Sequence, residues 1–92
     1  MAPNDTIVAL ATARGRAALA IVRMSGPDSI QIAASRFSKP EIADAASHTA
    51  HVGYVLDSDG NELDQVVLTL FREPRSATGE NIVEITCHGG DL

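Results

Sequence analysis

The sequence predicts an α+β domain in which a mixed β-sheet packs against at least one helix. Three observations support this prediction: short apolar runs rich in β-branched residues near both ends, one segment with helical periodicity, and an Asp-Gly turn between two further apolar runs. Their order, strand, strand, helix, hairpin, strand, is typical of domains whose helices cover one face of a sheet. The 92 residues make one small domain at most.

Two strands are predicted near the N-terminus. Residues 6–12 form a short apolar run rich in β-branched residues, and a basic, glycine-containing loop follows it. Residues 17–24 form a second apolar run, whose length alone does not separate helix from strand. We favour a strand, because Ile21 and Val22 are β-branched and the Ser-Gly-Pro sequence at 25–27 ends the run sharply.

A helix is predicted next. Ser25 and Asp28 match the Ser-x-x-Asp form of a capping box, with Pro27 in the first turn. The apolar positions that follow have the spacing i, i+3, i+4 and i+7, which places them on one helical face: Ile30, Ala33, Ala34 and Phe37. The Ser-Lys-Pro sequence at 38–40 stops the helix, and residues 41–50 are expected to be a mobile or weakly helical connector.

A hairpin and a final strand complete the predicted sheet. Residues 51–56 and 66–71 are predicted strands that flank residues 57–61, where Asp-Gly supplies the positive φ of a tight turn. A polar loop rich in Pro and Gly leads to the last strand at 82–88. The chain stops at Leu92, where a helix could begin, so we expect it to be an N-terminal part of a longer protein.

The last predicted strand carries the most informative polar side chains. Because strand side chains alternate between faces, two sets are expected, a core-facing set (Val83, Ile85 and Cys87) and a more polar set (Ile82, Glu84, Thr86 and His88). Glu84 is either an ordinary residue of a solvated sheet face, or a carboxylate that accepts two adjacent N–H donors of a planar ring. His88, which precedes two glycines, is either a turn residue bonded to the backbone, or a general base or ligand contact.

Arg23 is the second unusual position. If residues 19–25 form a strand, Arg23 shares a face with apolar residues, and a buried guanidinium needs an anionic partner such as Glu84. The alternative is an exposed arginine at a sheet edge, with its aliphatic stem packed on the sheet. Cys87 is expected to be a small, inert core side chain, and Glu80 to be solvated at the start of its strand.

Composition excludes several classes of function. A net charge of -5 and an aromatic content of 3% provide neither the basic surface nor the stacking platform that direct nucleic-acid binding needs. The single cysteine fits a reducing compartment, and the His and Cys positions have no zinc-site spacing. No P-loop or dinucleotide fingerprint occurs, and no signal peptide or membrane span is predicted. We therefore expect a soluble, cytoplasmic domain without membrane contact.

Several motifs gain specificity when they are taken together. The most specific combination is Thr-Gly-Glu at 78–80, Glu84 in mid-strand and His-Gly-Gly at 88–90. Further matching positions are residues 5–9, 15–16, 21–26 and 63–65, with Phe71, Pro74 and Ser76. In this order they resemble the N-terminal domain of the MnmE (TrmE) family of tRNA-modification GTPases over nearly the whole chain, except residues 30–50. One departure is Ala-Ala-Leu at 17–19, where the family is often glycine-rich.

The resemblance implies a fold and a ligand. The family's N-terminal domain is similar to the tetrahydrofolate-binding domain of the aminomethyltransferase superfamily, binds a 5-formyl-tetrahydrofolate-type one-carbon donor, and forms homodimers. By motif position, Arg23 and Glu84 match the family's folate contacts, and Glu80 and His88 are further candidates. The resemblance implies no catalytic or metal-binding residue in this chain, because the GTPase domain that uses GTP with K+ and Mg2+, and the helical domain, lie outside it.

The resemblance also implies partners for the whole protein. Together with the flavoprotein MnmG, in a heterotetramer, the full-length protein is expected to modify carbon 5 of the wobble uridine of certain tRNAs in a GTP-dependent cycle. The 92 residues alone are not expected to be catalytic. Two alternatives stay open: a ligand-free dimerisation module, and a stand-alone folate-binding relative of the aminomethyltransferases.

Overall fold

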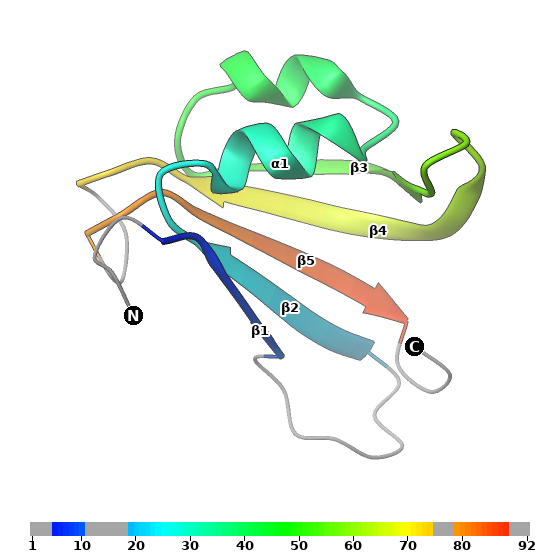
Figure 1. Cartoon of the computed structure of the whole chain (residues 1–92), viewed down its shortest axis with the longest axis horizontal. Helices are drawn as coiled ribbons and strands as arrows, with labels where there is room; N and C mark the ends of the chain where they lie inside the picture. The colour runs from blue at the N-terminus through cyan, green and yellow to red at the C-terminus, as the bar shows by residue number, and fades with distance from the viewer. Residues whose placement is uncertain (1–4, 11–18, 75–78, 89–92) are drawn as a thin grey trace.

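The chain folds as one sheet with helical cover, as a computed structural model describes it for residues 5–10, 19–74 and 79–88 (Figure 1). The elements along the chain are β1 Ile7–Leu10, β2 Leu19–Ser25, α1 Ser29–Ser35, the 3-10 helix η1 Pro40–Asp44, β3 Thr49–Leu56, β4 Glu62–Phe71 and β5 Ile82–His88. The predicted α+β class is therefore confirmed, and the ambiguous run before residue 25 is a strand, as predicted.

The five strands lie in the order β1-β2-β5-β4-β3. Every pairing between these described strands is antiparallel, so the predicted mixed sheet is wrong for this part of the chain. The reason is topological. Strands β2 and β4 run in the same direction, and β5 enters between them in the opposite direction (Figure 1). The last strand along the sequence is thus the central strand of the sheet.

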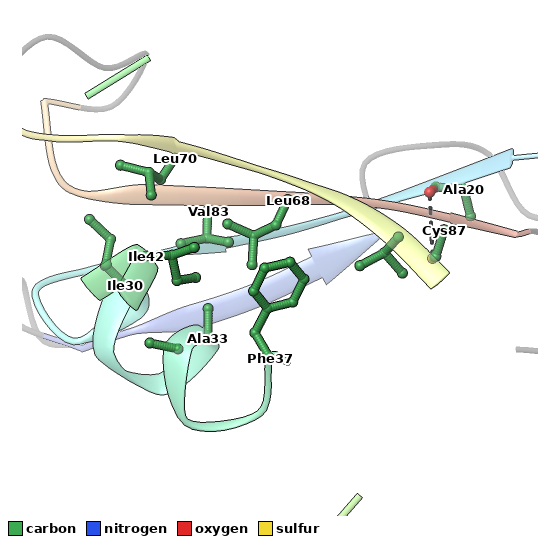
Figure 2. Close-up of a cluster of buried hydrophobic side chains, with 11 residues drawn as sticks. Ala20, Ile30, Ala33, Phe37, Ile42, Leu68, Leu70, Val83 and Cys87 are labelled. Atoms are coloured by element: carbon green, nitrogen blue, oxygen red, sulfur yellow. Dashed lines mark hydrogen bonds between the residues drawn. The ribbon is translucent and has the colours of Figure 1, made fainter. Parts of the chain in front are cut away.

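The core lies between the sheet and one helical layer formed by α1 and η1 (Figure 1). Alternate residues of β4 face this layer, and Val66, Leu68 and Leu70 are 3%, 1% and 0% exposed. Three residues of the predicted apolar stripe lie on α1 and are buried: Ile30, Ala33 and Ala34. Phe37 is buried too, but α1 ends at Ser35, so this residue lies beyond the helix and the predicted helix is too long at its C-terminal end. Figure 2 shows these side chains gathered against the sheet. The periodicity of the sequence therefore identified the buried face of α1 correctly, and the buried residues of β4 add the opposite side of the core.

The predicted capping box is wrong. Ser25 is the last residue of β2, and Asp28, the N-cap residue of α1, makes no side-chain capping bond. Instead the Ser29 hydroxyl donates to the carbonyl oxygens of Gly26, at 2.9 Å, and Asn81, at 3.1 Å. The strand continues further than the motif implied, because Ser25 still pairs with Ile82 of β5. The helix start is consequently tied to the segment that leads into β5.

The predicted mobile connector is more ordered than expected. It contains η1, in which Ile42 is 1% exposed and belongs to the core, and β3 begins already at Thr49. The Arg72 side chain holds this segment, because its Nε and Nη2 donate to the carbonyl oxygens of Ala45 and Ala43, both at 2.8 Å. A single apolar residue among polar ones gave too weak a pattern to predict this contact.

The chain segment that follows α1 forms backbone hydrogen bonds to the outer strand β3. Phe37 forms a β-bridge with Val55, the Leu56 N–H donates to the Arg36 carbonyl at 2.7 Å, and the Ser38 N–H donates to the Tyr54 carbonyl at 2.9 Å. The β3–β4 hairpin is closed by residues 57–61, with φ of 84° at Gly60. The predicted turn is in place, although β4 begins four residues earlier than predicted, at residue 62.

Candidate functional site

Arg23 and Glu84 meet on adjacent strands. They are Cα partners in the β2–β5 ladder, and Arg23 Nη2 donates to Glu84 Oε1 at 3.2 Å. Their neighbours Val22 and Ile85 pack against the core, so the pair lies on the sheet face away from α1. Because β1 lies outside β2, the alternative of an arginine at a sheet edge is wrong. The structure brings the pair together, and its role in ligand binding stays a prediction.

The pair is partly exposed and incompletely satisfied. The side chains of Arg23 and Glu84 are 41% and 26% exposed, and a single hydrogen bond joins them. Arg23 Nε is buried, and the described residues provide no acceptor for it. A buried donor without an acceptor is unfavourable by about 1–3 kcal/mol, so this N–H would gain by donating to a ligand's carbonyl oxygen once the side chain turns to expose it. A carboxylate that can accept N–H donors therefore lies beside a donor that needs an acceptor.

Glu80 was expected to be solvated, but its carboxylate makes a hydrogen bond within the protein. Its Oε2 accepts a hydrogen bond of 3.3 Å from the hydroxyl of Ser25, which is 6% exposed. Ser25 is two residues from Arg23 on β2, so both lie on the same face of the sheet. The structure thus places a second carboxylate on the face that carries the Arg23–Glu84 pair.

His88 and Cys87 lie at the far end of β5. His88 is its last residue and the Cα partner of Leu19, four positions from Glu84 and eight from Glu80. Cys87 is buried, and its thiol donates to the Ala20 carbonyl oxygen at 3.6 Å (Figure 2). Burial raises the pKa of the Cys87 thiol, which keeps it in the unreactive form. The predicted core position of Cys87 is confirmed, and its low reactivity stays a prediction.

The rest of this sheet face is mixed in character. Thr86 pairs with Ile21 and with Val67, and Glu84 pairs with Thr69 as well as with Arg23. Among the apolar residues beyond them, Val67 is 38% and Val52 is 52% exposed. At the start of β5, Ile82 pairs with Ser25 and is only 1% exposed. The face is therefore open beside Arg23 and covered towards Ser25.

Sequence reasoning missed two residues of this face. Ser25 was assigned to a helix cap, although its spacing of two from Arg23 on a strand would have placed it on the same face. Thr69 lies beside Glu84 only because β4 pairs with β5, a long-range relation that no local pattern contains. The described residues contain no group of three or more His, Cys, Asp or Glu side chains arranged for a metal ion. No helix in the described part has the length and apolar character to cross a membrane.

Comparison with known proteins gives a consistent result. Residues 6–92 match the family model described as the GTP-binding protein TrmE N-terminus. The chain is 60% identical over its full length to the tRNA modification GTPase MnmE of Salinibacter ruber, and 52% identical over 98% of its length to that of Chlamydia felis. A Bacillus mycoides relative of the same name is 46% identical over 94% of the chain. The chain spans only about a fifth of the length of these relatives.

Proposed function

The chain belongs to the TrmE N-terminal family, and from this membership we propose that it is the folate-binding and dimerisation domain of a tRNA-modifying GTPase. The proposed ligand is a 5-formyl-tetrahydrofolate-type one-carbon donor. The proposed fold relationship is to the tetrahydrofolate-binding domain of the aminomethyltransferases. The observation that carries the ligand proposal is the Arg23–Glu84 pair, with its buried and unpartnered Nε–H.

The donors and acceptors of this pair fit a pterin ring. A carboxylate accepts two parallel N–H donors, and the amino-pyrimidinone edge of a pterin presents adjacent N–H groups. The carbonyl of the same ring is an acceptor, which is the partner that Arg23 Nε lacks. Glu84 would orient the ring by accepting its N–H groups, and Arg23 would donate a hydrogen bond to the ring carbonyl oxygen. The bound folate supplies the one-carbon unit, and these residues supply orientation and affinity.

For the intact protein we propose the activity that its relatives' names describe, a GTPase acting in tRNA modification. Its GTP, K+ and Mg2+ would bind outside these 92 residues. We further propose the flavoprotein MnmG as its partner in modifying carbon 5 of the wobble uridine, and a cytoplasmic location. Because the chain carries a net charge of -5, the tRNA would be held by other parts of the assembly.

A ligand-free dimerisation module is the second candidate. The exposed apolar side chains Val52 and Val67 favour it, since such residues on a sheet face are suited to contact another surface. The shared face of Arg23 and Glu84 favours ligand binding, because a pure assembly surface has no need for a donor left without an acceptor. Folate binding and dimerisation can also coexist on one domain.

Calorimetric titration of the intact protein with 5-formyl-tetrahydrofolate tests the ligand proposal. Glu84→Gln and Arg23→Ala should each raise Kd roughly 10- to 150-fold, as expected for losing a hydrogen bond to a charged group worth about 1.5–3 kcal/mol. Glu41→Gln and Lys39→Ala, two exposed charge changes at η1, are the matched controls and should bind normally. Wild-type affinity in both site variants would remove this pair from the site, and absence of binding by the wild type would refute the folate proposal.

A further inference from the structure

Ser25 is a buried polar residue outside the proposed pair of ligand contacts. Its side chain is 6% exposed, and its hydroxyl donates to Glu80 Oε2 at 3.3 Å. Ser25 follows Met24, which packs against the core, so Ser25 faces the other side of the sheet together with Arg23. The hydroxyl therefore directs a carboxylate onto the face that carries the proposed site.

Asn81, the residue that follows Glu80, is held by three hydrogen bonds, two at its carbonyl oxygen and one at its side chain. The Asn81 carbonyl oxygen accepts from the Gly26 N–H at 2.9 Å and from the Ser29 hydroxyl at 3.1 Å. Asn81 Oδ1 accepts from the Glu73 N–H at 2.9 Å. With Asn81 held in this way, the chain is anchored just after Glu80, while the Glu80 side chain keeps its rotamer freedom. The bond from Ser25 restricts that freedom.

The hydrogen bond from Ser25 to Glu80 lies where water is largely excluded, which strengthens it. Ile82, the Cα partner of Ser25 on β5, is 1% exposed, so water has little access to this end of the face. A hydrogen bond is stronger where water is excluded. Ser25 and Arg23 are two residues apart on β2, a separation of about 7 Å along the strand. Glu80 itself is only half-buried, so a flat two-ring ligand held by Arg23 and Glu84 can extend towards it from the open part of the face.

We propose that Ser25 is a positioning residue for ligand binding, which aims the Glu80 carboxylate at N–H donors of the ligand held by Arg23 and Glu84. The inference rests on the proposed folate function and adds to it a second carboxylate acceptor, set by a serine on the neighbouring strand. A purely structural Ser25–Glu80 bond would instead fasten the start of β5 to the end of β2. Stability would then depend on it, and affinity would not.

The test is calorimetric titration of the intact protein with 5-formyl-tetrahydrofolate, using wild type, Glu80→Gln, Ser25→Ala and the double variant. Glu80→Gln should raise Kd about 10-fold and Ser25→Ala about 3-fold, as expected for losing and for loosening a charged acceptor. The double variant should match Glu80→Gln alone, because the proposed effect of Ser25 on affinity is exerted through the Glu80 carboxylate. Ser25→Thr retains the hydroxyl and should restore affinity. Ser35→Ala, which removes an exposed helix hydroxyl, is the matched control.

The possible outcomes distinguish a failure of the Ser25 and Glu80 roles from a failure of the proposed folate binding. Normal affinity of Glu80→Gln, with binding lost in Glu84→Gln, overturns the role of Glu80 and leaves the folate function standing. Losses that add in the double variant overturn the positioning role of Ser25. A wild-type protein that binds no folate refutes the proposed function itself. If circular dichroism shows Ser25→Ala to be unfolded, Glu80→Gln at wild-type melting temperature decides, a 10-fold loss supporting the proposal and normal affinity overturning it.

Discussion

Gly53 is expected to be intolerant of even one added methyl group. A Cβ at this position of β3 would lie 2.5 Å from Phe37 Cζ, 2.9 Å from Phe37 Cε1 and 2.8 Å from Ser38 Oγ. All three distances are shorter than van der Waals contact. The Phe37 ring is 3% exposed and belongs to the core, so it cannot move aside without displacing its neighbours. We therefore predict that Gly53→Ala destabilises the domain by overpacking.

The magnitude follows from two opposing effects. Overpacking is unfavourable by about 1–3 kcal/mol, and replacing glycine by alanine restricts the unfolded chain, which contributes about 0.4–1 kcal/mol of stability. Taking the middle of each range, about 2 and about 0.7 kcal/mol, the expected net loss is about 1.3 kcal/mol. For a domain of this size each kcal/mol corresponds to about 4–8 °C in Tm. Urea denaturation of the 92-residue chain, followed by far-UV circular dichroism, measures the loss directly.

A second variant identifies the cause of the loss. Phe37→Leu removes the ring atoms that the new methyl group would meet, so its cost and that of Gly53→Ala should not add. Gly60→Ala is the contrasting control, because φ is +84° there and nothing lies within 4 Å of the new Cβ. Its loss comes from backbone strain, and Phe37→Leu should not relieve it. Full stability of Gly53→Ala, or strict additivity with Phe37→Leu, would refute the packing argument.

Three further predictions concern other parts of the fold. Leu70→Ala should lower the free energy of unfolding by about 2–5 kcal/mol in urea titrations, because Leu70 is 0% exposed, whereas Leu63→Ala at a 65% exposed position should change it by less than about 0.5 kcal/mol. The pKa of Asp57 is lowered, chiefly by the hydrogen bond from the Asn61 backbone N–H, so an NMR titration of Asp57 should give a pKa below the usual value of about 3.9. The contribution of Asp57 to stability is present at neutral pH and should disappear as pH falls through that lowered pKa. The Cys87 thiol, with its pKa raised by burial, should react with a disulfide reagent at pH 8 much more slowly in the folded chain than in urea, and equal rates would contradict its burial.

Local patterns predicted the elements better than their arrangement. The helical stripe from Ile30 to Ala34 and the alternation of β5 were correct, because each depends on residues only a few positions apart, whereas Phe37 is buried without being helical. The mixed sheet was wrong, because strand direction depends on where β5 enters, which is a long-range property. The buried Ile42 was missed for the same reason. Its contact depends on Arg72, thirty residues away, which holds the segment around it.

The candidate site shows the same division. Glu84 stood out because a carboxylate in mid-strand is unusual, and Arg23 because a guanidinium among apolar residues needs a partner. That these two are direct neighbours follows only from the β2–β5 register. The bond from Ser25 to Glu80 could not be predicted, because the same serine also fitted a helix cap, and only the length of β2 decides between the two.

The central position of β5 has a consequence for how the protein is made. During synthesis the chain leaves the ribosome from its N-terminus, so β2 and β4 are complete before the strand that joins them exists. Until residues 82–88 emerge, each of these strands presents an unpaired edge, which is where nascent chains associate wrongly. Pairing across 61 residues, as between Arg23 and Glu84, is slow compared with hairpin closure. The proposed ligand site can therefore form only after β5 has entered between β2 and β4, and ligand binding would stabilise the chains in which this pairing has succeeded.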